Sequence, residues 1–356
     1  MLGFIRFCLA GFVAWSHTLA YPLWNIQLGV SSVVAFYFIS GFLMAKTYPR
    51  FASNKNPILS FYTDRIFRLY PAFLLWFVIS CLYYYYGGYD FSKTNLIGEV
   101  LLIPQNYHFV TSNITNHMID PAWSLGAEFQ WYLLVPLIAF ISNITRWVLL
   151  VAMLSGQILV FSLQILGISN DSCSLLPLAL FDRCIYLSDL LGYRLLVFAS
   201  AAFLLGHVTS LMQWRGRRFI FLLGYCFSIL WIIYIWHGQK LPRFNDVMFA
   251  YVVMLPLITL SMTVKIKNRG LHKIDMICGK LSYPVFLTHF LAINVMDRYF
   301  PAIFNLSGLN LEFTKTFFAG CITLGFSAIL MYIQDKIDVF RIKYRGFKSL
   351  RYSNPF

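Results

Sequence analysis

The sequence has little charge. Only 12% of its 356 residues are Asp, Glu, Lys or Arg, about half of the roughly 25% found in soluble domains. Acidic residues are the scarcest, with 14 Asp and Glu against 28 Lys and Arg, whereas 59% of the residues are apolar and 19% are aromatic. This composition excludes an ordinary cytosolic enzyme, a disordered chain and a nucleic-acid-binding protein, and it indicates a chain whose surface is covered by lipid.

Motifs of the common soluble chemistries are also missing. The seven cysteines show no CxxC pair and no zinc-ligand spacing, so neither a disulfide scaffold nor a metal site is indicated. Cys173 and Cys184 form the one pair that an oxidising compartment could join. The sequence contains no GxSxG nucleophile elbow, P-loop, HExxH motif or dinucleotide fingerprint.

Long apolar windows are what the sequence has instead. A transmembrane helix needs roughly 20 apolar residues, and ten windows of suitable length predict an all-α integral membrane protein of about ten transmembrane helices. The first window is expected to be a retained helix, because a His interrupts it and no A-x-A cleavage site follows. The predicted spans lie at 3–22, 29–46, 66–86, 127–142, 146–166, 190–212, 219–236, 247–264, 281–299 and 315–334.

The basic residues predict how these helices are oriented. With the N-terminus inside, the loops and tail on the cytoplasmic side contain 20 Lys and Arg, whereas the opposite side contains 7. The positive-inside rule therefore predicts that both termini are cytoplasmic and that the number of spans is even. We expect one transmembrane domain over residues 1–336, followed by a basic cytoplasmic tail over 337–356.

Ionisable residues inside a span are expensive and are functional candidates for that reason. Arg6 and His17 are eleven residues apart in the first window, which is three turns plus about 20°, so both lie on one helix face roughly 16 Å apart along the axis. An unperturbed imidazole has a pKa of about 6.5 and suits proton transfer. Alternatively, Arg6 snorkels to the interface and His17 only hydrogen-bonds a neighbouring helix.

Three further positions have both a functional and a structural explanation. Glu128 could orient a His in another helix as the acid of a triad does, or it could favour the positive end of its own helix. Arg65 and Arg68 match phosphate geometry, but arginines at a cytoplasmic helix end also satisfy the positive-inside rule.

The motifs resemble those of the acyltransferase-3 family of integral membrane acyltransferases, in the same order along the chain. The Arg6-x10-His17 pair resembles that family's first-helix signature. Four further segments resemble its FFxxSGFL, FYxxRxxRIYP, WSLxxExxFYLxxP and SYPxYLxH motifs, and they are Phe36–Leu43, Phe61–Pro71, Trp123–Pro136 and Ser282–His289. One departure is Val34, where many relatives have an acidic residue, and this leaves Glu128 as the better acid partner for a His.

This resemblance implies transfer of an acetyl group from cytoplasmic acetyl-CoA to a hydroxyl of an extracytoplasmic cell-surface glycan, in the bacterial inner membrane. Lipopolysaccharide O-antigen is the leading acceptor, with exopolysaccharide, peptidoglycan or a small glycoside left open. The rival interpretation is a transporter or flippase of lipid-linked glycans, because intramembrane charges also mark transport paths. No repeat in the two halves of the sequence supports it.

The resemblance also implies roles for individual residues, with no metal among the cofactors. His17 would act as the general base, with Glu128 holding its tautomer. The CoA donor would be bound by Arg6, Arg65, Arg68, Tyr70 and Ser40. The carbohydrate acceptor would be bound by Trp123, Ser124 and His289.

Overall fold

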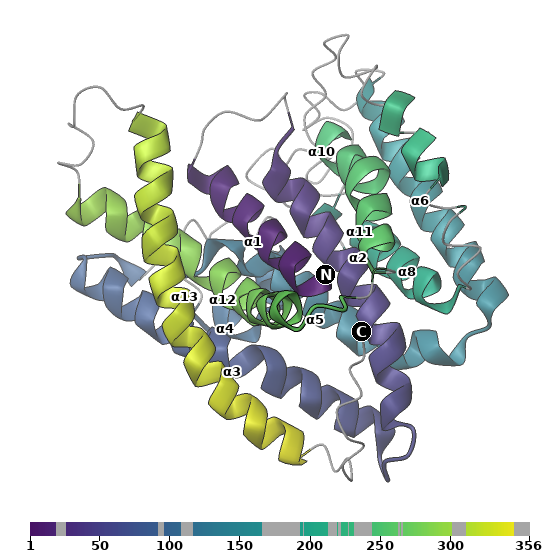
Figure 1. Ribbon diagram of the computed structural model, residues 1–356, viewed down its shortest axis with the longest axis horizontal. Helices are drawn as coiled ribbons and strands as arrows, with labels where there is room; N and C mark the ends of the chain where they lie inside the picture. Colours follow the sequence, from purple (N-terminus) through teal and green to yellow (C-terminus); the bar gives the residue numbers. More distant parts are fainter. Residues whose placement is uncertain are drawn as a thin grey trace. The chain divides into compact units, whose positions relative to one another are not determined.

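The computed structural model describes residues 1–18, 26–91, 96–107, 117–165, 193–194, 196–212, 219, 222–226, 228–230, 244–262, 264, 266–300 and 311–344. Every regular element in these residues is helical (Figure 1), in agreement with the predicted all-α class. Cys173 and Cys184 lie outside the described residues, and so does half of the window at 219–236.

Several helices in the described part of the chain are long and apolar enough to cross a membrane. These candidate spans are Leu28–Phe51, Pro57–Tyr86, Phe244–Ser261, Arg269–Tyr299 and Phe313–Val339, and shorter apolar helices cover Asn143–Leu159 and Ala199–Leu211. Described helical residues fall in all ten predicted windows. The fold is that of a helical membrane protein, while the total of ten spans and the side on which the termini lie stay predictions.

The chain divides into two compact units. Unit 1 comprises Met1–Tyr21, Arg50–Tyr89 and Ile258–Phe356, and unit 2 comprises Pro22–Pro49 and Asp90–Leu257. The main helices of unit 1 are α1 (Leu2–Thr18), α3 (Pro57–Tyr86), α12 (Arg269–Tyr299) and α13 (Leu311–Tyr344). Those of unit 2 are α2 (Leu28–Thr47), α4 (Leu96–Leu101), α5 (Trp123–Phe140), α6 (Asn143–Ile165), α8 (Leu196–Leu211) and α10 (Phe244–Phe249). Helix α10 continues through the π-helical turn η6 (Ala250–Met254) into α11 (Leu255–Ser261). The boundary between the two units in the sequence falls within α11.

In unit 1, α1 and α12 are joined closely at the start of α1. The Asp275 carboxylate accepts a hydrogen bond from the Phe4 backbone N–H at 2.9 Å, which caps the N-terminus of α1 and suits its dipole. A Cβ on Gly3 would come within 2.0 Å of the Asp275 carbonyl oxygen, so only glycine allows this approach. The cap therefore fixes one end of α1 against α12.

The same two helices meet again further along, and both contacts show that they run in the same direction. His17 lies 14 residues after Gly3, and His289 lies 14 residues after Asp275. The imidazole rings of His17 and His289 are 5.3 Å apart between centroids. Fourteen residues are two heptads, the spacing at which packed parallel helices present the same face to each other.

Helix α3 runs parallel to α12 on another side of it. The Tyr283 hydroxyl donates to the Leu69 carbonyl at 2.9 Å, and the Tyr83 hydroxyl donates to the Asn294 carbonyl at 3.0 Å. In both pairs the later residue of α3 faces the later residue of α12. Pro57 at the first turn of α3 suits the start of a helix, because the N–H that proline lacks has no partner there in any case.

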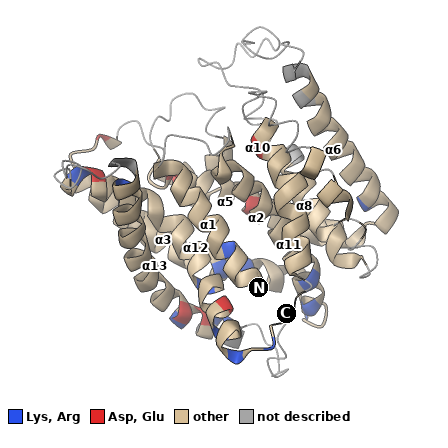
Figure 2. Cartoon of the chain, turned by 45° about the horizontal axis from the view of Figure 1, so that its top comes forward, with Lys and Arg blue, Asp and Glu red and all other residues tan. Residues whose placement is uncertain are grey.

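Helix α13 runs in the opposite direction to α12. Lys280 pairs with Asp335 at 2.8 Å, and Lys315 pairs with Asp297 at 2.7 Å, so the numbers fall along α13 as they rise along α12. The start of α1 and the end of α13 therefore lie at the same end of unit 1. Charged residues are found in the C-terminal part of α13 (Figure 2), among them Asp338 and Arg341.

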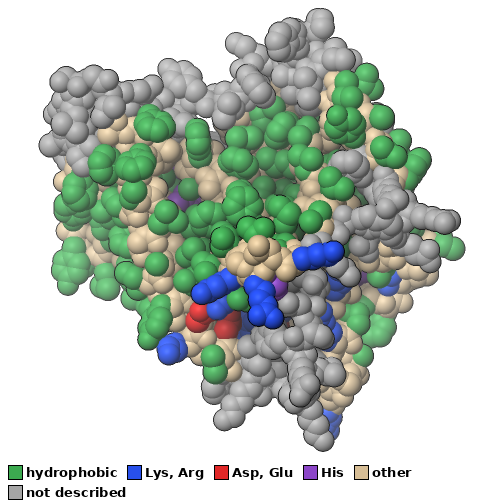
Figure 3. All heavy atoms as spheres, in the orientation of Figure 1, with side chains coloured by type: hydrophobic (Ala, Val, Ile, Leu, Met, Phe, Trp, Pro, Cys, Tyr) green, Lys and Arg blue, Asp and Glu red, His purple; other side chains and the backbone are tan. Residues whose placement is uncertain are grey.

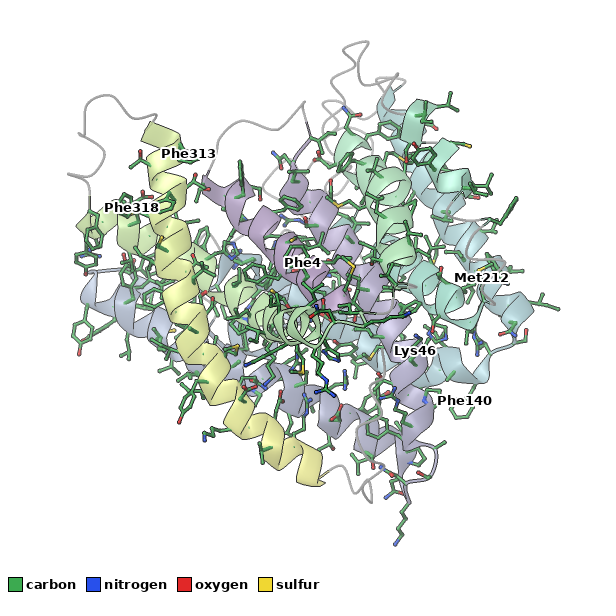
Figure 4. All side chains as sticks on the ribbon, in the orientation of Figure 1. Phe4, Lys46, Phe140, Met212, Phe313 and Phe318 are labelled. Carbon is green, nitrogen blue, oxygen red and sulfur yellow. The ribbon has the colours of Figure 1, made fainter. Side chains whose placement is uncertain are left out.

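In unit 2, α2 and α8 cross at glycines. A Cβ on Gly41 would lie 1.8 Å from the Phe203 carbonyl oxygen, and one on Gly206 would lie 1.9 Å from the Phe38 carbonyl oxygen. The two helices run antiparallel through this crossing. Beyond it, Lys46 extends its ammonium over the Phe42 ring at 4.4 Å, near the end of α2 (Figure 4).

Candidate active site

The two histidines of unit 1 lie side by side in different surroundings. His17 is exposed at the end of α1, whereas the side chain of His289 is fully buried in α12. The His17 ring is tilted by 37° to the His289 ring and meets the Phe290 ring edge-on, with its centroid 5.8 Å away. The two residues were predicted to have separate roles, and in the structure their rings lie side by side.

The hydrogen bonds of His289 define which of its nitrogens is available. Its Nδ1 lies 3.2 Å from the Val285 carbonyl oxygen, which can only accept, so Nδ1 carries the proton in this arrangement. Its Nε2 is then an acceptor with a lone pair. This Nε2 is buried and has no hydrogen-bond partner among the described residues. A buried acceptor of this kind can take a hydrogen bond from a ligand group that reaches it.

A cavity of about 210 Å³ lies against His289 within unit 1. It is bounded by α1, α12 and α13, and its wall is mostly apolar. Residues from each of these helices line it, among them Gly11, Trp15, His289, Ile293, Gly320 and Leu324. The buried imidazole thus meets an apolar space large enough for a small ligand group.

The predicted phosphate-binding arginines lie in a network of ion pairs at the charged end of unit 1. Arg65, which is 8% exposed, pairs with its neighbour Asp64. Arg68 lies 3.1 Å from Asp338 of α13. Arg341 of α13 links the two pairs, at 3.2 Å from Asp338 and 3.6 Å from Asp64.

Among the residues that the structure describes, these ion pairs join three guanidinium groups to two carboxylates. A phosphate that binds there would compete with Asp64 and Asp338 for arginines that are already paired. Arg341 is a member that sequence analysis missed, because it belongs to the segment assigned to the tail. A weak signal was present, since Asp338 and Arg341 are three residues apart and share a helix face.

Arg6 and Tyr70, the other predicted CoA contacts of unit 1, are partly buried. Arg6 lies on the same helix as His17, as the spacing predicted. Tyr70 meets the Phe73 ring edge-on, with 6.1 Å between centroids. Contact of either residue with a donor stays a prediction.

In unit 2, Glu128 has two hydroxyl partners. Its Oε1 accepts a hydrogen bond from Ser40 at 2.7 Å and another from Tyr132. Ser40 was predicted to contact the donor, and its observed partner is this carboxylate. Tyr132 was missed as a site residue, although its position four residues after Glu128 places it on the same helix face.

Trp123 and Ser124, the predicted acceptor contacts, lie at the start of α5. The Ser124 hydroxyl donates to the Pro121 carbonyl at 3.1 Å, within its own turn. The Arg194 guanidinium lies 4.4 Å from the centre of the Trp123 ring, in cation–π geometry. The Asn106 amide holds the Arg194 backbone by donating to its carbonyl at 3.0 Å.

The loop before α5 packs against it through a strained residue. Leu102 has a positive φ of 62°, which is rare for a residue with a branched side chain. Its carbonyl would lie 2.3 Å from a Cβ on Gly126.

The pairing of Glu128 with His17 joins residues of separate units and stays a prediction, as do the roles assigned to all ten site residues. No group of three His, Cys, Asp or Glu among the described residues could hold a metal ion.

Comparison with known proteins identifies the family that the motifs resemble. The acyltransferase-3 family, whose description is an acyltransferase domain, matches residues 2–332. An uncharacterized protein of Aquifex aeolicus is 27% identical over 186 residues, which cover 50% of this chain and 72% of the relative. An uncharacterized protein of Haemophilus influenzae is 31% identical over 119 residues, or 30% of this chain and 48% of the relative. No solved structure matches the chain.

Proposed function

Because this chain belongs to the acyltransferase-3 family, we propose that it moves an acetyl group from cytoplasmic acetyl-CoA to a hydroxyl of an extracytoplasmic cell-surface glycan. Family membership indicates a membrane acyltransferase. We propose in addition that the donor is acetyl-CoA, that the protein lies in the inner membrane and that the leading acceptor is lipopolysaccharide O-antigen. The observation that carries the proposal is the His17 and His289 pair beside an apolar cavity.

The pair supports a direct transfer in which His17 takes the proton of the attacking hydroxyl. The hydroxyl oxygen forms a bond to the thioester carbonyl carbon, the carbon–sulfur bond breaks, and the proton passes to the departing CoA sulfur. The Nε2 of His289 can accept a hydrogen bond but cannot donate one while Nδ1 is protonated. Because the single proton of the attacking hydroxyl goes to His17, Nε2 would accept a hydrogen bond from a second hydroxyl of the acceptor, and we assign this binding role to His289 together with Trp123 and Ser124.

The donor is proposed to bind at the charged end of unit 1. Arg65, Arg68 and Arg341 exceed the two carboxylates of their network by one positive charge. The CoA phosphates would take over part of their pairing, because bidentate arginine–phosphate contacts are strong. Arg6 lies between this end and His17 along α1, and Tyr70 follows Arg68 in α3. Ser40 keeps its proposed donor contact in unit 2.

Glu128 is the second proposed catalytic residue. Its carboxylate is held by Ser40 and Tyr132, and both of these hydroxyls donate to it. An ionised carboxylate can stabilise an imidazolium that forms during proton transfer. The proposed role requires the negative charge, so replacement by Gln would remove it while keeping the shape.

The decisive experiment is mass spectrometry of the surface glycans from cells with and without the gene. Loss of the gene should remove one acetyl unit from each modified repeat, and wild-type protein should restore it. The H17A variant should fail to restore it because the proton acceptor is gone. The S16A variant is the matched control, since the Ser16 hydroxyl only donates to Val13 of its own helix.

Two outcomes would contradict the proposal. Restoration by H17A at the wild-type rate would remove His17 from the chemistry. An unchanged glycan, together with purified protein that releases no CoA from acetyl-CoA in the presence of acceptor, would remove the acetyltransferase function itself.

A further inference from the structure

The cavity beside His289 follows a long stretch of unit 1. Its wall extends along α1 from Phe7 to Thr18 and along α13 from Thr316 to Leu324. These stretches correspond to roughly 16 Å and 12 Å of helix, at about 1.5 Å per residue. The cavity is thus elongated and mostly apolar, and the buried imidazole of His289 lies in its α12 wall between Val285 and Ile293.

Two glycines of this wall have no packing reason to be glycine. A Cβ on Gly11 or on Gly320 would meet no atom within 4 Å, in contrast to Gly3, where the neighbouring helix would clash. Both residues are in helices, where glycine costs about 1 kcal/mol relative to alanine. The absence of side chains at these two positions leaves the space open rather than bringing helices together.

We propose that this cavity receives the hydrocarbon tail of the donor acyl group, so that the protein transfers acyl chains longer than acetyl. The inference rests on the proposed acyl transfer and adds the chain length of the donor to it. The reacting carbonyl would lie at the His17 and His289 pair, and the tail would extend from there past Gly11 and Gly320. A cavity of about 210 Å³ leaves room beyond the single methyl group of an acetyl.

The buried Nε2 of His289 favours this occupant over a bilayer lipid. The wall of the cavity is partly open, and exposed apolar side chains such as Phe313, Phe317 and Leu324 cover the neighbouring surface of α13 (Figures 3 and 4). A lipid tail that entered from this side would leave Nε2 without a partner. A second hydroxyl of the acceptor, beside the attacking one, satisfies Nε2, and the acyl carbonyl must lie next to the attacking hydroxyl, at the His17 and His289 pair.

The test is to fill the cavity and measure donor chain length. Purified wild-type protein and the G320L variant are compared with acetyl-, propionyl-, butyryl- and hexanoyl-CoA at a fixed acceptor concentration, with CoA release as the readout. Each methylene moved from water into apolar surroundings contributes about fourfold. Butyryl has two more methylenes than acetyl, so the ratio of kcat/KM for butyryl-CoA to that for acetyl-CoA should fall about 15-fold in G320L.

The G325L variant is the matched control. Gly325 lies on the same helix, its Cβ would also meet no atom within 4 Å, and it does not line the cavity. Its butyryl-to-acetyl ratio should stay within about twofold of the wild-type ratio, since nothing enters the cavity. G11L fills the cavity from α1 and should lower the ratio as G320L does, which gives a second variant if one of them folds poorly.

Several outcomes would overturn the inference. An unchanged ratio in both G11L and G320L would show that no acyl tail enters the cavity. A change in the KM for the acceptor alone, measured by varying the acceptor at a fixed acetyl-CoA concentration, would assign the cavity to the acceptor's hydrocarbon chain and overturn the inference. Wild-type protein that transfers acetyl but none of the longer chains would refute the inference and leave the proposed function intact, whereas a lack of CoA release from every donor would refute both.

Discussion

Replacement of Gly41 by alanine should push α2 and α8 apart. The new Cβ would lie 1.8 Å from the Phe203 carbonyl oxygen, and ordinary contact begins at 3.4 Å, so the helices must separate by about 1.6 Å. The Tyr37 and Phe203 rings, stacked at 4.5 Å between centroids, cross the same interface and would lose contact. The Cβ meets backbone, which cannot turn away as a flexible side chain can.

The size of the effect follows from two opposing contributions. Overpacking of a close contact costs about 1–3 kcal/mol, whereas alanine gains about 1 kcal/mol over glycine in a helix. G325A gains the second contribution alone, because its Cβ meets open space. The free energy of unfolding of G41A should therefore lie about 1–3 kcal/mol below that of G325A.

The measurement is reversible unfolding of the purified protein in detergent, followed by circular dichroism. Since Gly206 separates the same two helices, the cost of the G41A/G206A double variant should be smaller than the sum of the single costs. Both glycines of this cycle lie in unit 2, on α2 and α8. A G41A protein as stable as G325A, or fully additive G41A and G206A costs, would refute the close crossing.

Two further perturbations test unit 1. The R68A variant should raise the KM for acyl-CoA with little change in kcat. The D338N variant removes the carboxylate that competes for Arg68, so it should lower the KM for acyl-CoA. If both variants have the wild-type KM, Arg68 does not bind the donor and serves only the positive-inside rule. The D275A variant should lower the free energy of unfolding by about 0.5–2 kcal/mol through loss of the α1 cap. D275N keeps an acceptor oxygen and should recover most of that loss, and unfolding curves that do not separate the two variants would contradict the cap.

The helices were predictable because the length of an apolar run is a local property of the sequence. Their ends were less so: α12 begins at Arg269, twelve residues before its predicted window, and Asn268 caps it by accepting from the backbone N–H groups of Gly270 and Leu271. The hydropathy window stops where polar residues begin, although the helix continues through them. Such a cap is visible in sequence, but it does not mark the membrane boundary.

The sequence predicted which residues belong to the site better than it predicted which residues contact each other. The spacing of Arg6 and His17 placed both on α1, because a helix has a fixed periodicity. The pairing of Arg68 with Asp338 joins residues 270 positions apart, and no local pattern encodes it. The contact between His17 and His289 depends on how α1 packs on α12, which is a property of the tertiary structure.

The cap at Asp275 makes the length of α1 matter as much as its composition. Because Gly3 is held against α12, the direction in which His17 points depends on the number of residues between them. A deletion of one residue there would turn His17 by about 100° around the helix axis, away from His289. An insertion of a whole heptad would keep it facing α12 but move it roughly 10 Å along the axis. The number of residues between Gly3 and His17 therefore determines whether the His17 imidazole faces His289.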